Sequence, residues 1–256
     1  MGLRDRLIDP RSPESTAACG LDSYVMGWID SLRVLGAMGR VTAPTLVDLV
    51  RDRMTREAID ERTHWFARRV VELLDVHLTA TGAERVPTDR AYVYMSNHQS
   101  HLDIPMLYAT LPSRTIRMLG KTELFQIPLW GRGLRAAEFI EVDRSNHARA
   151  VASIARAAEL IADGVSVYLA PEGTRSRDGK VGPLKKGGFH LAIETGAPIV
   201  PVAIRGTIDI LPRGSRKMRS GCAVDVTIGA PIPVVGRTLD DLVAEVHAFL
   251  VRHVEA

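Results

Sequence analysis

Residues 91–110 read AYVYMSNHQSHLDIPMLYAT, and this stretch decides the fold class that the chain predicts. The apolar run at 91–95 is typical of a buried strand, and residues 103–110 have the length and composition of a short helix. The residues between them are polar and include two histidines. A strand that leads through a polar turn into a helix is the repeating unit of α/β folds.

The same alternation continues towards the C-terminus. Further apolar runs of strand type lie at 115–119, 138–142, 165–170, 199–204 and 223–228. Helical stretches lie at 123–136, 146–163, 185–195 and 238–254. We therefore predict an α/β fold with a mixed, largely parallel sheet that is flanked by helices.

Residues 21–80 lack strand-like alternation and read as helical. Apolar residues at spacings of three and four form one amphipathic stripe before Pro44 and a second one at 56–78. We expect Pro44 to separate the two stripes, so that they pack as a helical hairpin. The predicted organisation is thus a flexible tail at 1–20, an N-terminal helical segment at 21–80 and an α/β domain at 81–256.

The composition is that of a globular chain. Of the 256 residues, 46% are hydrophobic and 25% are charged, and the net charge of +3 is too mild to identify a partner. Cys19 and Cys222 stand far apart without CxxC spacing, so we expect neither a disulfide framework nor a structural zinc, which fits a reducing compartment. No uncharged run approaches the roughly 18 apolar residues of a membrane span, and the N-terminus lacks a signal-peptide core. We expect a soluble or peripherally bound protein.

Polar residues follow several predicted strands within a few positions. His98, Arg144 and Glu172 each come shortly after an apolar run. In α/β sheets, ligands collect at the carboxyl ends of the strands. We therefore expect these side chains to lie at one edge of the sheet.

The histidine segment admits three interpretations. Ser100 and Asp103 have the spacing of a helix capping box, in which case His98 only occupies a loop. A metal site would use His98, His101 and Asp103, but no HExxH motif or second Cys/His cluster supplies further ligands. In the third interpretation, His98 precedes the helix and Asp103 orients its imidazole as a general base. Because no GxSxG motif is present, the hydroxyl that such a base activates would belong to a substrate.

The stretch at 170–188, APEGTRSRDGKVGPLKKGG, contains a glycine turn flanked by basic residues. Backbone N–H groups in such a turn can approach a phosphate closely, and Arg175 can bind two of its oxygens. The alternative is a solvated charged loop.

Together these segments resemble the glycerolipid acyltransferase family, most closely the 1-acyl-glycerol-3-phosphate acyltransferases. Its blocks occur in order: the HxxxxD block as NHQSHLD, then GKTELFQIPLWG, FIEVDR, PEGTRS and APIVPVAI. The resemblance covers residues 75–235.

The resemblance implies a role for each matching residue. His98 would be the base that deprotonates the acceptor hydroxyl, Asp103 its orienting partner, and Lys121 a stabiliser of developing charge. The residues implied in binding the glycerol phosphate are Arg144, Glu172, Gly173, Thr174 and Arg175. Those implied in the acyl or acceptor pocket are Pro198 and Pro201.

The implied reaction moves a fatty acyl group from acyl-CoA or acyl carrier protein to the sn-2 hydroxyl of 1-acyl-glycerol-3-phosphate and gives phosphatidic acid. Neither a metal, a cofactor nor a nucleic acid is expected. The lysophospholipid acceptor implies work at a membrane surface, so we expect a cytoplasmic protein peripherally bound to the inner face of the cell membrane. Residues 21–80 would either touch that membrane or pack on the α/β domain.

Three alternatives remain open from the sequence. One keeps the chemistry but uses another acceptor, such as glycerol 3-phosphate or a lyso-ornithine lipid. Another is a metal-dependent hydrolase that uses His98, His101 and Asp103. The last is a lipid- or nucleotide-binding module without catalysis.

Overall fold

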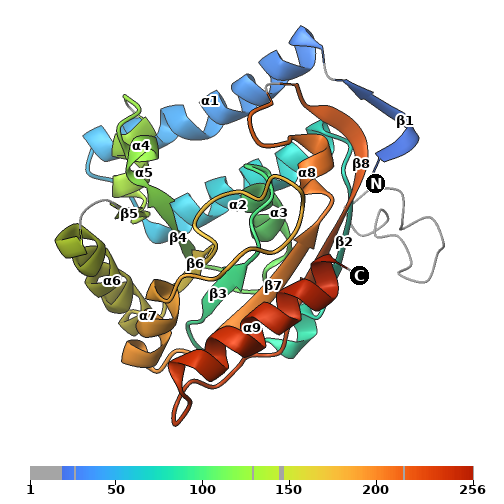
Figure 1. The fold of residues 1–256 in the computed structure, drawn as a ribbon. Coiled ribbons are helices and arrows are strands. Elements are labelled where there is room, and N and C mark those ends of the chain that lie inside the picture. Colours follow the sequence, from blue (N-terminus) through green and yellow to red (C-terminus); the bar gives the residue numbers. More distant parts are fainter. Residues whose placement is uncertain (1–18, 26, 129, 144–146, 216, 256) are drawn as a thin grey trace.

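The computed structural model describes residues 19–25, 27–128, 130–143, 147–215 and 217–255 (Figure 1). Its strands are β1 (Cys19–Val25), β2 (His77–Thr81), β3 (Val93–Ser96), β4 (Ile116–Lys121), β5 (Ile140–Val142), β6 (Ser166–Leu169), β7 (Ile199–Arg205) and β8 (Arg219–Ile228). Its helices are α1 (Trp28–Val50), α2 (Arg56–Leu73), the 3-10 turn η3 (Ala83–Arg85), α3 (Asp103–Thr110), α4 (Thr122–Phe125), α5 (Trp130–Ala136), α6 (His147–Ala162), α7 (Gly187–Thr195), α8 (Thr207–Ile210) and α9 (Leu239–Val254).

The strands of the described residues form one eight-stranded sheet in the order β1-β8-β7-β3-β6-β4-β5, and β2 also pairs with β8. Strands β7, β3, β6, β4 and β5 run parallel, whereas β8 is antiparallel to β7. The predicted α/β class, a mixed and largely parallel sheet between helices, is confirmed.

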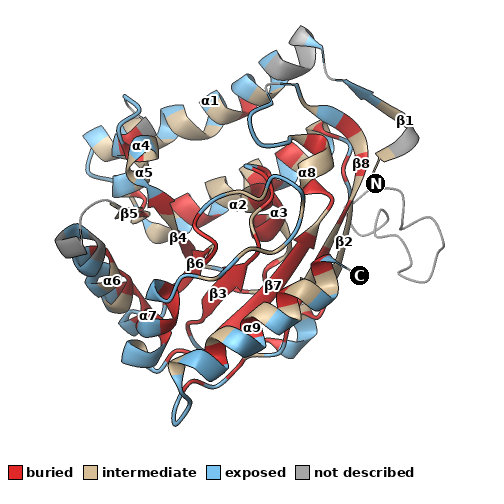
Figure 2. Cartoon of the chain, in the orientation of Figure 1, coloured by how far each residue is buried: buried red, intermediate tan, exposed pale blue. Residues whose placement is uncertain are grey.

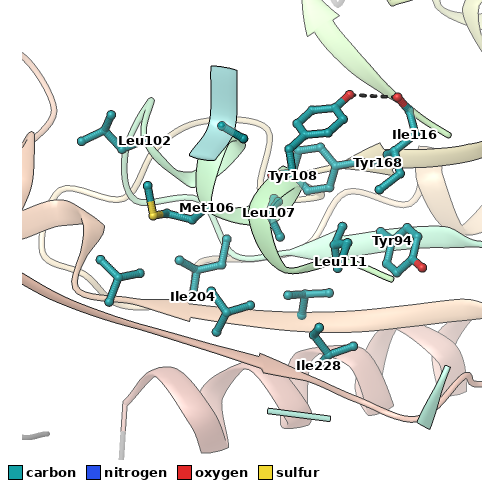
Figure 3. Close-up of a cluster of buried hydrophobic side chains, with 14 of the residues drawn as sticks. Tyr94, Leu102, Met106, Leu107, Tyr108, Leu111, Ile116, Tyr168, Ile204 and Ile228 are labelled. Atoms are coloured by element: carbon teal, nitrogen blue, oxygen red, sulfur yellow. Dashed lines mark hydrogen bonds between the residues drawn. The ribbon is translucent and has the colours of Figure 1, made fainter. Parts of the chain in front are cut away.

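The two faces of the sheet bury separate cores, because side chains alternate along each strand. On one face, Tyr94 and Ile204 pack with α2 and α3, and Figure 3 shows α3 side chains such as Leu107 in this cluster. On the other face, Met95 and Ile199 pack with α6, α7 and α9. Figure 2 shows the buried residues concentrated on the central strands. Burial on both faces explains the nearly continuous apolar runs of the parallel strands.

The N-terminal region differs from its prediction in three respects. It contains β1 and β2, two edge strands, in a region predicted to be helical. Strand β2 is half exposed along most of its length and so shows no apolar alternation. Pro44 lies inside α1 and does not end it, although a proline removes one helical hydrogen bond, because α1 packs against α2 and α5. The expected hairpin of α1 and α2 is present, and α1 also contacts α5 (Figure 1).

The expectation about the cysteines is wrong, since Cys19 and Cys222 form a disulfide. The antiparallel pairing of β1 with β8 places the two residues opposite each other, with their Cα atoms 4.1 Å apart. Their separation of 203 residues hides this contact from any reading of local spacing. The cysteines therefore no longer favour a reducing compartment.

In the part of the chain that the structure describes, no helix has a stretch long and apolar enough to cross a membrane.

Candidate active site

The parallel strands deliver polar residues to one edge of the sheet. Strands β3, β6, β4 and β7 all point their carboxyl ends towards this edge. His98 follows β3, Glu172 follows β6, Thr207 follows β7, and Lys121 is the last residue of β4. The predicted convergence of His98 and Glu172 is confirmed.

His98 and Asp103 form a hydrogen-bonded pair. Their Nδ1 and Oδ2 atoms lie 2.7 Å apart, and the side chain of Asp103 is fully buried while that of His98 is 21% exposed. Helix α3 begins at Asp103, so the loop before it turns the imidazole back towards the carboxylate. This is the geometry of the general-base interpretation.

The same carboxylate also holds the loop that precedes α3. Its Oδ2 accepts the backbone N–H groups of Gln99 and Ser100 at 2.8 and 3.0 Å, and its Oδ1 accepts the hydroxyl of Thr207. An ionised carboxylate can only accept hydrogen bonds, so Nδ1 of His98 must carry the proton in this pair. The lone pair of the neutral imidazole then lies on Nε2. Only one half of the predicted capping box is present, because Asp103 accepts the N–H of Ser100 while its own N–H donates to the backbone carbonyl of Ser100 and not to the hydroxyl.

Asn97 fixes the place at which His98 leaves the sheet. Its side-chain amide donates to the carbonyl of Ile204 and accepts the N–H of the same residue, both at 2.8 Å. These two bonds extend the pairing of β3 with β7 by one position beyond the last paired residue, Ser96. The next residue is His98, whose direction is therefore set by the sheet.

Glu172 holds the loop that follows β6 against the histidine segment. Its Oε1 accepts the N–H of His98 at 2.8 Å, and its Oε2 accepts the N–H of Gly182 at 2.9 Å. Gln99 adds a bond from Nε2 to the carbonyl of Gly179. Burial raises the pKa of Glu172, although its two backbone donors act in the opposite direction. Both oxygens accept backbone N–H groups, so Glu172 supports the turn after β6.

The side chains of Arg175 and Lys121 lie close enough to His101, beside the dyad, to affect its pKa. Desolvation lowers the pKa of His101, and the positive charges of Arg175 and, more weakly, Lys121 lower it further. Arg175 is half-buried and Lys121 is exposed. Desolvation and the neighbouring Arg213 lower the pKa of the Arg175 guanidinium. The structure thus brings Arg175 and Lys121 into the surroundings of the dyad.

The remaining predicted residues have different placements. Gly173 has a φ of 73°, a left-handed conformation suited to glycine, and Thr174 after it is exposed. Arg144 lies outside the described residues.

The two prolines are not brought to the dyad. Pro198 precedes β7 and so lies at the amino edge of the sheet, opposite the edge that carries His98. Pro201 lies two residues from both Ile199 and Ala203 along β7, so it shares their face of the sheet, which packs with α9. It therefore points to the face of the sheet away from α3.

Sequence reasoning missed Thr207, Asn97 and Arg213. Thr207 was detectable, because it follows a parallel strand by two residues as His98 follows β3. The contacts of the other two depend on residues 107 and 38 positions away and left no local signal.

No group of three or more histidines, cysteines and carboxylates in the described ranges is arranged to hold a metal ion. The oxygens of Asp103 point to the four donors named above and not to a point shared with His101.

The sequence profile of the Acyltransferase family matches residues 77–205, about half of the chain. The match runs from the start of β2 to the end of β7 and includes His98 and Asp103. The chain belongs to the acyltransferase family. Among its curated relatives is 1-acyl-sn-glycerol-3-phosphate acyltransferase BAT2, chloroplastic, of Brassica napus, which is 40% identical over 59% of this chain and 44% of its own length. The 1-acyl-sn-glycerol-3-phosphate acyltransferase of Limnanthes douglasii is 33% identical over 75% of this chain and 69% of its own length.

A solved acyltransferase structure has the same fold. The crystal structure of the 1-acyl-sn-glycerophosphate (LPA) acyltransferase PlsC from Thermotoga maritima superposes with a TM-score of 0.76 at 28% identity, over 89% of this chain and 94% of that one. This chain spans less than half of the length of the chloroplast acyltransferases that it matches.

Proposed function

We propose that this protein transfers a fatty acyl group from a thioester donor, acyl-CoA or acyl carrier protein, to the sn-2 hydroxyl of 1-acyl-sn-glycerol-3-phosphate, giving phosphatidic acid. The observation that carries the proposal is the contact of His98 Nδ1 with Asp103, which leaves Nε2 as the free base at the edge where ligands collect. The names of the relatives support the choice of acceptor.

In the proposed reaction, Nε2 of His98 accepts the proton of the acceptor hydroxyl as its oxygen attacks the thioester carbonyl carbon. The carbon–sulfur bond then breaks, and the imidazolium returns the proton to the leaving thiolate. Asp103 stabilises the imidazolium between these two steps, because its ionised carboxylate contacts Nδ1. We assign Lys121 to the developing negative oxygen, which needs a positive donor.

The phosphate of the acceptor is assigned to the turn after β6. Arg175 supplies a guanidinium that can bind two phosphate oxygens, and it follows the turn of Gly173 and the exposed Thr174. Arg144 is retained as a second basic residue of this site. Glu172 takes the supporting role that its two backbone contacts give it.

The test is direct. The purified protein is incubated with lysophosphatidate and acyl-CoA, and free thiol and phosphatidate are measured together; equimolar formation of both is expected. The variant His98→Ala should lose transfer by at least about a thousandfold with unchanged thermal unfolding. A folded and fully active His98→Ala protein would refute the base assignment.

Two controls separate the alternatives. A panel with glycerol 3-phosphate and other lyso-lipids as acceptors identifies the preferred acceptor. Transfer in the presence of EDTA should remain complete, whereas a hydrolase that depends on a metal held by His98, His101 and Asp103 would lose its activity.

We also propose that α1 rests on a membrane surface at the inner face of the cell membrane. Leu32, Leu35, Val47 and Val50 are exposed by 46 to 86%, and at about 100° per residue they fall within a sector of about 120°. Helix α1 contacts α2 and α5 with its other side. Such an exposed apolar stripe on a helix is suited to the interface of a bilayer.

Flotation with anionic vesicles tests this placement. The double variant Leu32→Gln and Leu35→Gln should reduce the bound fraction severalfold, while Val235→Gln, an exposed apolar residue outside α1, should leave it unchanged. Equal binding of all three proteins would contradict a role for α1.

A further inference from the structure

The segment that follows β7 is tied to the candidate site at three places. Thr207 donates to the carboxylate of the dyad, and the hydroxyl of Ser100 donates to the carbonyl of Leu211 at 2.9 Å. Two residues later, Nη1 of Arg213 donates to the carbonyl of Arg175 at 2.9 Å. The chain from α8 onwards therefore forms a wall of the site, and its last anchor lies on the phosphate-binding turn itself.

This anchor brings the guanidinium of Arg213 to the backbone of Arg175, whose own guanidinium lies within the field of both Arg213 and Asp103. Within the described ranges, neither Arg175 nor Arg213 has a salt bridge to a carboxylate, and the guanidinium of Arg175 has no hydrogen bond. Nearby Arg205, at the end of β7, does have such a partner in Asp225, at 2.9 Å. Two unneutralised guanidinium groups repel each other, and an anion between them removes that repulsion.

The surroundings of the two arginines match a phosphate monoester. Desolvation and the charge of Arg213 lower the pKa of Arg175, so the two groups lie within each other's field. A phosphate monoester carries close to two negative charges, and each guanidinium can offer it two parallel N–H donors. Arg213 is exposed, so a ligand can reach it from solvent.

We propose that Arg213 is a substrate-binding residue that holds the phosphate of the acceptor jointly with Arg175. This proposal rests on the proposed function and adds a residue of the α8–β8 loop to the phosphate site. Its contact with the backbone carbonyl of Arg175 holds the guanidinium of Arg213 beside the turn that carries Arg175. Selectivity for acceptors with a phosphate headgroup follows from the paired charges.

The experiment compares Arg213→Gln with Arg213→Lys. Glutamine keeps N–H donors but is shorter than arginine and has no charge, whereas lysine restores the charge. For Arg213→Gln we expect the KM for lysophosphatidate to rise about tenfold with little change in kcat and in the KM for acyl-CoA. Lysine should recover most of the loss, and the KM of the glutamine variant should depend less steeply on salt than that of the wild type.

Arg90→Gln is the matched control, because Arg90 is 61% exposed before β3, at the opposite edge of the sheet, and contacts only its neighbour Asp89 within the described residues. It removes the same charge and should change neither KM.

Three results would overturn the proposal. These are an unchanged KM for lysophosphatidate, a rise confined to the KM for acyl-CoA, and an equal loss of kcat in the glutamine and lysine variants, which would indicate a role in the fold alone. If the wild type transfers no acyl group to lysophosphatidate, the proposed function fails instead. Calorimetric binding of glycerol 3-phosphate to wild type and Arg213→Gln then decides whether Arg213 binds a phosphate.

Discussion

Two aspartates of this protein have buried carboxylates, and the two carboxylates are stabilised by different kinds of partner. Asp103 at the candidate site is held by His98, a threonine hydroxyl and two backbone N–H groups, without an arginine. Asp60 on α2 is held by Arg117 at 2.6 Å and by the hydroxyl of Thr115 at 2.6 Å. The side chain of Arg117 is only 1% exposed.

The difference lies in where the positive charge is placed. Around Asp60, arginine neutralises the carboxylate, and the network continues from Arg117 through Glu138 to Arg56. Around Asp103, neutral donors satisfy the oxygens, so the negative charge remains available to the imidazole. The nearby Arg175 has no salt bridge within the described residues and is the one that we propose to bind the phosphate. The first arrangement links α2 to the sheet. The second leaves the negative charge of Asp103 in contact with His98.

Replacing Asp103 by asparagine should have the largest effect, because it removes the negative charge that distinguishes this site from a purely structural one. Each donor that now meets a carboxylate oxygen would meet either the NH2 group of the amide or its weaker acceptor oxygen. The imidazole of His98 would also lose the partner that holds its proton on Nδ1. We expect kcat to fall about a thousandfold to ten-thousandfold. Steady-state kinetics with lysophosphatidate and acyl-CoA measure this.

The control for that variant is Thr207→Val, which removes one donor from the far oxygen and leaves the imidazole contact in place. Its effect on kcat should be no more than about a hundredfold, since a hydrogen bond to a charged group is worth roughly 1.5–3 kcal/mol. Equal losses in the two variants would show that Asp103 acts through packing and not through His98.

The variant Asp60→Ala should destabilise the protein without touching catalysis. It leaves the buried guanidinium of Arg117 without its main partner, and removal of one member of a buried ion pair costs about 3–5 kcal/mol. Urea unfolding measures this loss, and kcat of the folded protein should be unchanged. The double variant Asp60→Leu with Arg117→Met should recover most of the stability. A fall in kcat of Asp60→Ala would contradict the separation of the two networks.

The fold was largely predictable from residues 91–205. The central strands are buried on both faces, so they form apolar runs, and such runs predict strands. The edge strands β1 and β2 were not predictable in this way. They are partly exposed and are stabilised by pairing with β8, more than 140 residues away in sequence. Pro44 was misread for a related reason, since α1 is a helix held by its contacts with α2 and α5.

The candidate site was predictable as far as its motifs are local. His98 and Asp103 lie five residues apart, and one loop and helix start bring them together. The role of Glu172 depends on the N–H groups of His98 and Gly182, which the sequence places in different segments. Arg213 required the fold as well, because its anchor is the carbonyl of Arg175.

Lys121→Gln should weaken catalysis moderately. Loss of a donor to a negative transition-state oxygen in a dry site costs about a hundredfold or more, but Lys121 is exposed, so solvent reduces the effect. We expect kcat to fall about tenfold to fiftyfold with an unchanged free energy of unfolding. Lys186→Gln, which loses an exposed lysine paired with Asp240, is the control and should keep full kcat. An unchanged kcat in Lys121→Gln would remove Lys121 from the site.

The smallest effect concerns Glu138 in the arginine-rich network, and it should depend on pH. Hydrogen bonds from Arg56 lower the pKa of Glu138 below its ordinary value of 4.5, and burial opposes this while Arg117 and Arg156 add to it. Because the folded pKa lies below the unfolded one, the carboxylate stabilises the protein above pH 4.5 and loses this contribution as the pH falls through the folded pKa. Glutamine at this position keeps the shape without the charge.

The wild type should therefore exceed Glu138→Gln by about 1–2 kcal/mol in the free energy of unfolding at pH 7. This difference should shrink towards zero on acidification below pH 4.5, as followed by urea unfolding at several pH values. Glu159→Gln serves as the control, since the pair of Glu159 with Arg156 is exposed and contributes little at any pH. A difference that stayed constant with pH would show that Glu138 acts by packing, and the network would then hold α2 by shape and not by charge.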